Sequence, residues 1–231
     1  MQERAPSAPI LSFEGLLVIV GGGTVDHQLL RDLQAAGGHL VGADGGADEI
    51  ARAGLLPEAI IGDFDSLLSP GDWLGRTRLI RLEEQLTTDF EKALYSTHAP
   101  VTVALGMTGR RFDHTLAALD AVTRYARDRI IILVDEHDLA MSLTGSFAFE
   151  VEVNERVSVY PLAPIRFRRS SGLQYPLDGL RLAPGERVGT SNVAIDGMFS
   201  IEPEPRSKAP WLLILDRKYL FAVAAAATAR A

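Results

Sequence analysis

The sequence predicts an α/β protein with an N-terminal parallel-sheet domain followed by a small all-β sandwich domain. Two patterns along the chain support this prediction. Up to about residue 140, short apolar runs alternate with helical patterns. Further on, short alternating runs are separated by Pro and Gly, and no helical pattern of useful length occurs before the tail. We therefore expect domains at 14–140 and 141–216, with flexible termini at 1–13 and 217–231.

Each expected strand of the first domain is a short apolar run. These runs lie at 16–20, 40–43, 59–61, 78–82, 101–105 and 130–134. Between them, apolar residues recur at helical spacing, as Leu29, Leu30 and Leu33 do. We expect four helices: one that ends near residue 36, one at 47–53, one that begins near 88 and one at 113–127. Strands and helices that alternate in this way form a parallel sheet with helices on both faces.

The second domain has a different periodicity. Its expected strands are 147–153, 156–160, 172–175, 181–182, 197–201 and 211–215. Short strands separated by turn residues at this spacing are typical of a sandwich or a barrel. The tail from Tyr219 onward is rich in alanine and is expected to be helical or frayed.

The composition excludes several classes of function. The 231 residues include no cysteine, which excludes disulfides, thiolate metal sites and cysteine nucleophiles. A net charge of −7 argues against a large basic surface for nucleic acid. No apolar stretch reaches the roughly 18 residues of a membrane helix, and the N-terminus lacks the apolar core of a signal peptide. We therefore expect a cytoplasmic protein without nucleic-acid or membrane partners.

Asp63 and Asp65 are the most informative pair in the chain. They follow the expected strand at 59–61, and alternate side chains of an extended segment point the same way. Two carboxylates so close repel each other unless a cation lies between them, and Mg²⁺ takes such ligands together with substrate phosphates. Asp and Ser are also ordinary turn residues, and Ser66 could cap a following helix. This segment alone therefore leaves a simple turn open.

Three further polar segments follow expected strands. They are Gly21–Thr24, Asp44–Gly46 and Gly106–His114. Ligands of open parallel sheets bind beyond the carboxyl ends of the strands, so these segments should converge on the edge that carries Asp63 and Asp65. Glycines such as Gly22 and Gly45 let backbone N–H groups approach phosphates. A tight turn at the glycines and a helix cap at Asp44 are the structural alternatives.

A helix is expected to begin at Thr88. Thr88 and Glu91 fit a capping box, and Asp89 is then an acid in the first turn, which the helix dipole favours. The same turn could direct Asp89 toward the carboxylate pair. Three carboxylates without cysteine or a histidine cluster suit Mg²⁺ better than zinc. Lys92, one turn later, could neutralise phosphate or simply be solvated.

Arg110 and Arg111 follow a glycine-rich turn. A solvated pair is common, but guanidinium groups also bind phosphate in a bidentate manner. Asp113 could be a helix N-cap. His114 is interpreted as a structural residue, because the sequence identifies no partner for it.

Taken together, these motifs resemble the thiamine pyrophosphokinase (thiamine diphosphokinase) family. Their order and spacing fit that family over roughly residues 16 to 215. Six motifs in order are much more specific than any one of them. They are ADGGA at 43–47, IGDFDS at 61–66, QLTTDFEKA at 85–93, GMTGRRFDH at 106–114, SGLQYPL at 171–177 and TSN at 190–192.

The resemblance implies a nucleotide-binding α/β domain joined to a β-sandwich that binds thiamine and forms a homodimer. Family members transfer pyrophosphate from ATP, as co-substrate, to the hydroxyl of thiamine, and they require Mg²⁺. Thiamine diphosphate and AMP are the products.

The resemblance also assigns roles to individual residues. Asp63, Asp65 and Asp89 are expected to be catalytic and to hold the metal, and Asp65 or Asp89 could accept the hydroxyl proton. Contacts to the nucleotide and its phosphates are expected from Gly22, Asp44, Gly45, Lys92, Arg110, Arg111 and Asp113. Contacts to the acceptor substrate are expected from Gln85, Ser191 and Asn192.

Two positions depart from the family pattern. Gln174 stands where the family usually has lysine, and Leu86 stands where an acid is expected. They leave open a pyrophosphokinase that acts on another heterocyclic alcohol, such as a pterin. A non-catalytic regulator that binds thiamine or a nucleotide also stays open, as does a metal-dependent phosphohydrolase.

Overall fold

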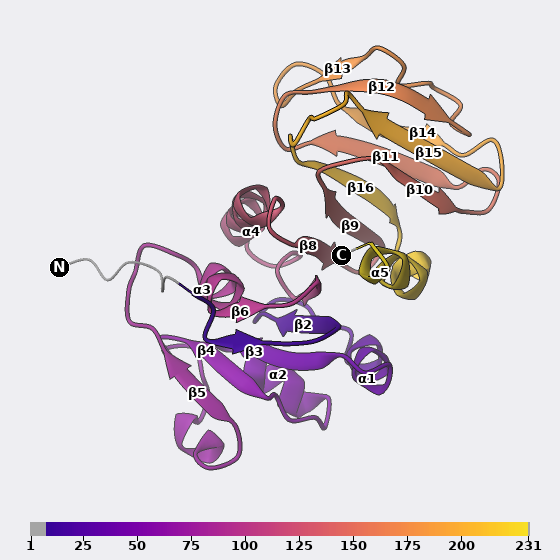
Figure 1. Cartoon of the computed structure of the whole chain (residues 1–231). Coiled ribbons are helices and arrows are strands. Elements are labelled where there is room, and N and C mark those ends of the chain that lie inside the picture. Colours follow the sequence, from indigo (N-terminus) through magenta and orange to yellow (C-terminus); the bar gives the residue numbers. More distant parts are fainter. Residues whose placement is uncertain (1–7, 231) are drawn as a thin grey trace. The chain divides into compact units, whose positions relative to one another are not determined.

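The computed structural model describes residues 8–230, and the chain divides into two compact units. One unit contains the chain up to Ala121 together with Leu133–Glu136. The other contains Val122–Ile132 and His137–Arg230. Helices accompany the strands of the first unit, whereas the second is built largely from strands (Figure 1). The predicted mixed α/β fold is therefore confirmed.

The first unit is organised around a parallel sheet with the strand order β7-β2-β3-β4-β5. Leu17 lies opposite His39 on one side and opposite Thr102 on the other. The central strands are buried along almost their whole length, as is typical of parallel strands covered on both faces. The strands are β2 (Leu16–Val20), β3 (His39–Ala43), β4 (Ala59–Gly62), β5 (Arg78–Arg81) and β7 (Val101–Leu105).

Helices connect these strands. α1 begins after Asp26, whose side chain accepts hydrogen bonds from the backbone N–H groups of Gln28 and Leu29. Among the described residues, no helix is long and apolar enough to cross a membrane. The helices are α1 (His27–Ala35), α2 (Gly46–Arg52), the short η1 (Pro70–Trp73), α3 (Asp89–Ser96) and α4 (Phe112–Tyr125).

α2 contacts the sheet directly through its backbone. A Cβ atom on Gly46 would lie 1.8 Å from the carbonyl oxygen of Val20, and a Cβ atom on Gly42 would lie 2.9 Å from Ala47. Only glycine allows these approaches, because real Cβ atoms do not come so close to other heavy atoms. The two glycines thus hold the start of α2 at the carboxyl ends of β2 and β3, where ligands of parallel sheets bind.

The second unit is built from antiparallel strands in two sets. Four strands pair in the order β14-β11-β16-β9, and a separate four-stranded sheet has the order β10-β15-β12-β13. Trp211 of β16 and Phe167 of β12 are fully buried, and their rings meet edge to face with 5.7 Å between centroids. The strands are β9 (Asp138–Leu143), β10 (Phe147–Glu150), β11 (Arg156–Pro161), β12 (Ile165–Ser171), β13 (Arg181–Leu182), β14 (Gly189–Val193), β15 (Met198–Pro203) and β16 (Trp211–Asp216).

The boundary between the units differs from the predicted position between residues 140 and 141. That position falls inside β9, whose residues Asp138–Leu143 all pair with β16. The second unit therefore takes up the chain from His137 onward, and the division also cuts β8 (Ile130–Val134). No glycine or proline stands between β8 and β9 to mark this change in the sequence.

Both predicted flexible termini contain ordered structure. Residues 217–231 were expected to be a flexible end that is helical or frayed; the described part forms η2 (Arg217–Tyr219) and α5 (Leu220–Thr228), which confirms the helical alternative. α5 buries Leu220, Val223, Ala224 and Ala227, a helical spacing that packs one face, and alanine has the highest helix propensity. At the other end, β1 (Leu11–Ser12) pairs with β6 (Thr97–His98), while residues 1–7 lie outside the described residues.

We predict that Gly46→Ala destabilises the protein by about 3 kcal/mol, because a methyl group cannot fit against the Val20 carbonyl. Alanine's better helix propensity would offset only about 1 kcal/mol of this loss. Urea denaturation measures the difference. Gly71→Ala is the matched control, since a Cβ atom there meets open space, and it should stay within about 0.5 kcal/mol of wild type. Equal stability of the two variants would contradict the contact.

Candidate active site

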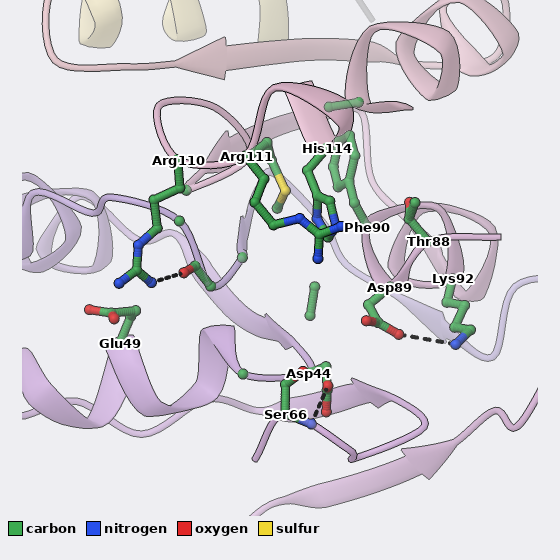
Figure 2. Close-up of a pocket in the computed structure, with 18 of the residues that line it drawn as sticks. Asp44, Glu49, Ser66, Thr88, Asp89, Phe90, Lys92, Arg110, Arg111 and His114 are labelled. Carbon is green, nitrogen blue, oxygen red and sulfur yellow. Dashed lines mark hydrogen bonds and ion pairs between the residues drawn. The ribbon is translucent and has the colours of Figure 1, made fainter. Parts of the chain in front are cut away.

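The loops that follow β2, β3, β4 and β7 line a cavity of about 880 Å³ in the first unit (Figure 2). This is the edge of the sheet at which the sequence placed the polar segments. Most of the predicted site residues line this cavity: Gly22, Asp44, Gly45, Asp63, Asp65, Gln85, Asp89, Lys92, Arg110 and Arg111.

Three carboxylates meet in this cavity. Asp44, Asp63 and Asp65 each offer an oxygen, and these oxygens lie within 4.8 Å of one another. Gly62 makes the approach possible, because a Cβ atom there would lie 2.8 Å from the Cβ of Asp44 and 3.2 Å from Oδ1 of Asp89. A glycine at the end of β4 therefore leaves room for acidic side chains from β3 and α3.

The segment that carries Asp63 and Asp65 is a turn, not the extended run on which the prediction rested. Phe64 has φ 70°, in the left-handed region, and the backbone N–H of Asp65 donates to Oδ1 of Asp63 at 3.2 Å. Phe64 packs against an apolar cluster that includes Trp73. The turn and the carboxylate pair, which the sequence left as alternatives, thus occur together.

Asp44 is the most buried of these acids. Its side chain is 1% exposed, and its Oδ2 accepts a hydrogen bond of 3.0 Å from the backbone N–H of Ser66. Its Oδ1 is also buried and has no hydrogen-bond partner among the described residues. Burial raises the pKa of Asp44 from 3.8 to about 6; the hydrogen bond from Ser66 opposes this effect, and the charge of Asp89 adds to it.

Asp63 is held on both oxygens. Its Oδ2 accepts from Nε2 of Gln85 at 2.7 Å and from Nζ of Lys92 at 3.4 Å, while Oδ1 accepts from the backbone of Asp65. Burial raises the pKa of Asp63, but the donors from Gln85, Asp65 and Lys92 outweigh it, and the net pKa is lowered. Asp63 is therefore ionised at neutral pH and fixed in orientation.

Asp89 and Lys92 form an ion pair one turn apart in α3. Thr88 caps the helix through its hydroxyl, which accepts from the N–H of Glu91, and Lys92 Nζ donates to Asp89 Oδ1 at 3.1 Å. The Lys92 side chain is 2% exposed. Burial lowers the pKa of Lys92, but its hydrogen bond with Asp89 and the nearby negative charges raise it above the usual value. Lys92 is thus a permanent cation beside the acids.

The carboxylate group suits a hard divalent cation. It offers only oxygen ligands, and one of them, Asp44 Oδ1, is buried without a described partner, which is costly for a carboxylate unless a ligand compensates it. The sequence placed Asp44 with the nucleotide contacts and Asp89 with the metal. The structure groups Asp44 with Asp63 and Asp65 and pairs Asp89 with Lys92. A metal role for Asp89 stays a prediction.

Two glycine loops also line the cavity. The N–H of Gly23 donates to the carbonyl of Gly106 at 2.9 Å, and a Cβ atom on Gly23 would lie 2.4 Å from that oxygen. Arg110 Nη1 donates to the carbonyl of Gly22 at 2.8 Å. The loops after β2 and β7 are thus joined backbone to backbone, and a side chain at Gly23 would separate them.

Arg111 and His114 extend from the start of α4 toward the cavity (Figure 2). Arg111 pairs with Asp113 at 2.6 Å, and both side chains are more than 60% exposed. Asp113 is not among the described residues that line the cavity, but it contacts two that do: it pairs with Arg111 and accepts from the backbone N–H of His114 at 3.0 Å. His114, interpreted from sequence as structural, does line it. No sequence signal beyond the family motif distinguished His114.

Sequence reasoning missed the contribution of α2. Asp48, Glu49 and Arg52 line the cavity, and Glu49 pairs with Arg52 and accepts from His27 Nε2 at 2.9 Å. These residues belong to α2, which begins directly after Asp44 and Gly45. A helix predicted to start at the site could therefore have indicated that its polar residues line the cavity.

The chain is similar in sequence to known thiamin pyrophosphokinases. The sequence model described as thiamin pyrophosphokinase, catalytic domain, matches residues 30–134. Thiamin pyrophosphokinase 1 of Caenorhabditis elegans is 28% identical over 170 residues, which cover 66% of this chain and 70% of that protein. Thiamine pyrophosphokinase of Bacillus subtilis is 27% identical over 177 residues, or 69% of this chain and 81% of the relative.

The sequence matches all indicate the thiamin pyrophosphokinase family. The fold of the chain is also shared with solved structures of family members. The thiamin pyrophosphokinase structure from Geobacillus thermodenitrificans has a TM-score of 0.73 at 24% identity, and the match covers 87% of this chain and 97% of that one. The structure from Candida albicans has the same TM-score at 16% identity, with coverage of 94% and 95%.

The two family residues expected at the acceptor, Ser191 and Asn192, lie in the second unit. Asn192 is 3% exposed, and its amide accepts from the N–H of Tyr175 at 3.0 Å and donates to the carbonyl of Tyr175 at 2.7 Å. Ser191 is exposed and has φ 60°. Asn192 therefore braces the backbone of Tyr175, whereas the Ser191 side chain faces solvent.

We predict that Asp44→Asn stabilises the metal-free protein at pH 8 by up to about 3 kcal/mol, the equivalent of a pKa raised from 3.8 to about 6. A raised carboxyl pKa means that the folded protein binds the proton more tightly, so wild-type stability falls between about pH 4 and pH 6 and stays low above. The gain should be full above pH 6 and vanish below pH 4. Urea denaturation with a chelator at several pH values measures it.

The control for this experiment is Asp72→Asn, which removes an exposed carboxylate outside the cavity. It should change stability by less than about 0.5 kcal/mol at every pH. A loss of stability in Asp44→Asn at pH 8 would show that Asp44 is not a buried, uncompensated charge.

Proposed function

We propose that this protein transfers a pyrophosphoryl group from ATP to the hydroxyl of thiamine, giving thiamine diphosphate and AMP. One observation carries the proposal: Asp44, Asp63 and Asp65 converge in a cavity that glycine loops and arginines also line. Sequence similarity to thiamin pyrophosphokinases supports it. The volume of about 880 Å³ is in the range of small-molecule sites.

Asp44, Asp63 and Asp65 would hold Mg²⁺, with Asp89 beside them. When bound, the ion supplies positive charge that neutralises the phosphate oxygens during transfer. Gln85 and Lys92 keep the Asp63 carboxylate ionised and oriented toward the other two acids. Without these donors, repulsion among the acids would drive the side chains apart or protonate them.

The glycine loops and arginines would bind the triphosphate. Backbone N–H groups at the strand ends can approach phosphate oxygens closely, since Gly22 carries no side chain there. Arg110 and Arg111 present guanidinium groups to the cavity, and Asp113 holds Arg111 in place. In transfers of this kind, the protein mainly positions the reactants and balances charge.

In the reaction, the thiamine hydroxyl oxygen would form a bond to the β-phosphorus of ATP. The bond between the β-phosphorus and the oxygen that links it to the α-phosphorus would break, and AMP would leave with that oxygen. The hydroxyl proton needs an acceptor, and the sequence left Asp65 and Asp89 as candidates. Burial raises the pKa of Asp89, although Lys92 opposes the shift, and a raised pKa favours proton acceptance. We therefore assign Asp89 as the acceptor of the hydroxyl proton.

The second unit would supply the acceptor contacts. Ser191 is exposed and could donate to thiamine, whereas Asn192 would act by bracing Tyr175 next to it. This proposal includes nucleotide binding by residues 14–140 and thiamine binding and dimerisation by residues 141–216. It also includes a homodimeric assembly and a cytoplasmic location. It includes neither nucleic acid nor a membrane as partner.

Thiamine is favoured over another heterocyclic alcohol because the named relatives are thiamine pyrophosphokinases. The departures at Leu86 and Gln174 do not alter the carboxylates. Leu86 is 66% exposed, and the backbone N–H of Gln174 bonds to the carbonyl of Val193 within the second unit.

We predict that with ATP, Mg²⁺ and thiamine the protein forms AMP and thiamine diphosphate in equal amounts. Asp63→Asn and Asp65→Asn should each lower turnover at least about a hundredfold, because an amide replaces a charged ligand worth several kcal/mol in the transition state. Chromatography of nucleotides and thiamine phosphates measures both products.

Asp72→Asn serves again as the control and should retain wild-type turnover. ADP as the nucleotide product would indicate a simple kinase, and phosphate release without an acceptor would indicate a hydrolase. Near-normal rates in both site variants would reject the role of these carboxylates.

A further inference from the structure

The loop between β5 and α3 is folded around one side chain, Glu84. Its Oε2 accepts from the backbone N–H groups of Leu86 at 2.7 Å and Thr87 at 3.2 Å. Its Oε1 accepts from the Thr87 hydroxyl and from the Tyr95 hydroxyl, the latter at 3.1 Å. Four donors thus converge on one carboxylate, which ties the loop to itself and to the second turn of α3.

These donors keep Glu84 ionised. Burial raises its pKa, but the hydrogen bonds from Thr87, Leu86 and Tyr95 outweigh burial and lower it below the usual value. Each oxygen receives two donors, so both must be acceptors. A glutamine at this position would offer one oxygen only, and its NH₂ group would face donors.

The residues next to Glu84 face the cavity, although Glu84 is not among the described residues that line it. Gln85, Thr87, Thr88 and Asp89 all line the cavity. Gln85 is exposed, so packing does not fix its side chain, yet its Nε2 lies 2.7 Å from Asp63 Oδ2. The conformation of the loop decides whether Gln85 reaches Asp63.

We propose that Glu84 is a positioning residue that orders residues 85–88 so that Gln85 holds the Asp63 carboxylate in place for the reaction. The kinetic part of this inference rests on the proposed pyrophosphoryl transfer. Glu84 does not touch the reactants, and its effect passes through Gln85. A misplacement of about 1 Å at such a contact can lower a rate about a hundredfold.

A double-mutant cycle tests this path. Glu84→Gln should lower kcat for AMP formation roughly tenfold to a hundredfold. Gln85→Ala should lower it by a similar factor, and Glu84→Gln added to Gln85→Ala should cost less than about threefold more, because both changes remove the same contact. If kcat of the double variant falls by the product of the two single-variant factors, the proposal is wrong.

Glu83→Gln is the matched control. Glu83 is adjacent and acidic, and its side chain pairs with Arg81 on the surface and is about 70% exposed, so the substitution should leave kcat unchanged. Tyr95→Phe is a second variant that removes a single donor. It should lower kcat a fewfold in the wild-type background and have no effect in Gln85→Ala.

Hydrogen exchange gives a readout that does not depend on turnover. In Glu84→Gln, the amides of Leu86 and Thr87 should exchange at least about tenfold faster, with no change in β2 or β3. Glu83→Gln should leave those two amides protected. Unchanged protection in Glu84→Gln would overturn the proposal. If wild type makes no AMP, the proposed function fails, and exchange alone decides whether Glu84 orders the loop.

Discussion

The mutual repulsion of the clustered carboxylates is the constraint on which the site depends. At a separation of 4.8 Å, the upper limit here, two such charges repel by about 3–4 kcal/mol at the effective dielectric of a protein surface, and they repel more strongly when closer. This is a large share of the roughly 5–15 kcal/mol that stabilises a typical domain. The parallel sheet offsets this cost with strands that are almost wholly buried, and the short loops after β3 and β4 leave the acids little freedom to separate.

The structure compensates these charges in two distinct ways. Asp63 and Asp89 receive a permanent partner in Lys92, and Asp63 also receives Gln85. Asp44 receives one backbone N–H on one oxygen, and its other oxygen has no described donor. The fold therefore balances part of the negative charge internally and leaves part of it for a ligand. An ion that binds the folded protein and not the unfolded chain would stabilise the folded state and offset the cost of the unpaired charge.

The sequence predicted the architecture around this site well. Glycine-terminated apolar runs identified the central parallel strands, because strands buried on both faces must be continuously apolar. The prediction failed where polar residues interrupt the apolar pattern of a strand. β12 has one exposed arginine, Arg166, between buried Ile165 and Phe167 and two more, Arg168 and Arg169, directly after them. β14 is mostly polar, so neither was recognised as a strand. The alanine-rich tail left a helix and a frayed end as alternatives, and the structure has the helix α5.

Within the site, sequence could indicate which residues converge but not how each side chain is used. Lys92 and Asn192 illustrate the limit. A lysine one turn after an acid reads equally as a phosphate ligand or as a solvated residue, yet this one is buried between two carboxylates. Asn192 reads as a substrate contact, yet the structure commits its amide to the Tyr175 backbone. Both roles depend on contacts with residues far apart in the chain, and residue type alone does not encode such contacts.

The order of the chain explains why the acids can act together. Asp44 follows β3, Asp63 and Asp65 follow β4, and these strands are neighbours in parallel register, with Ala43 opposite Ile61. Adjacent parallel strands end side by side, so acids placed just after both strands meet without any long loop. Asp89 reaches the same point from the start of α3, through a loop that must itself be ordered. The acids after the strands are therefore positioned by the sheet, whereas Asp89 and Gln85 depend on the hydrogen bonds of the loop before α3.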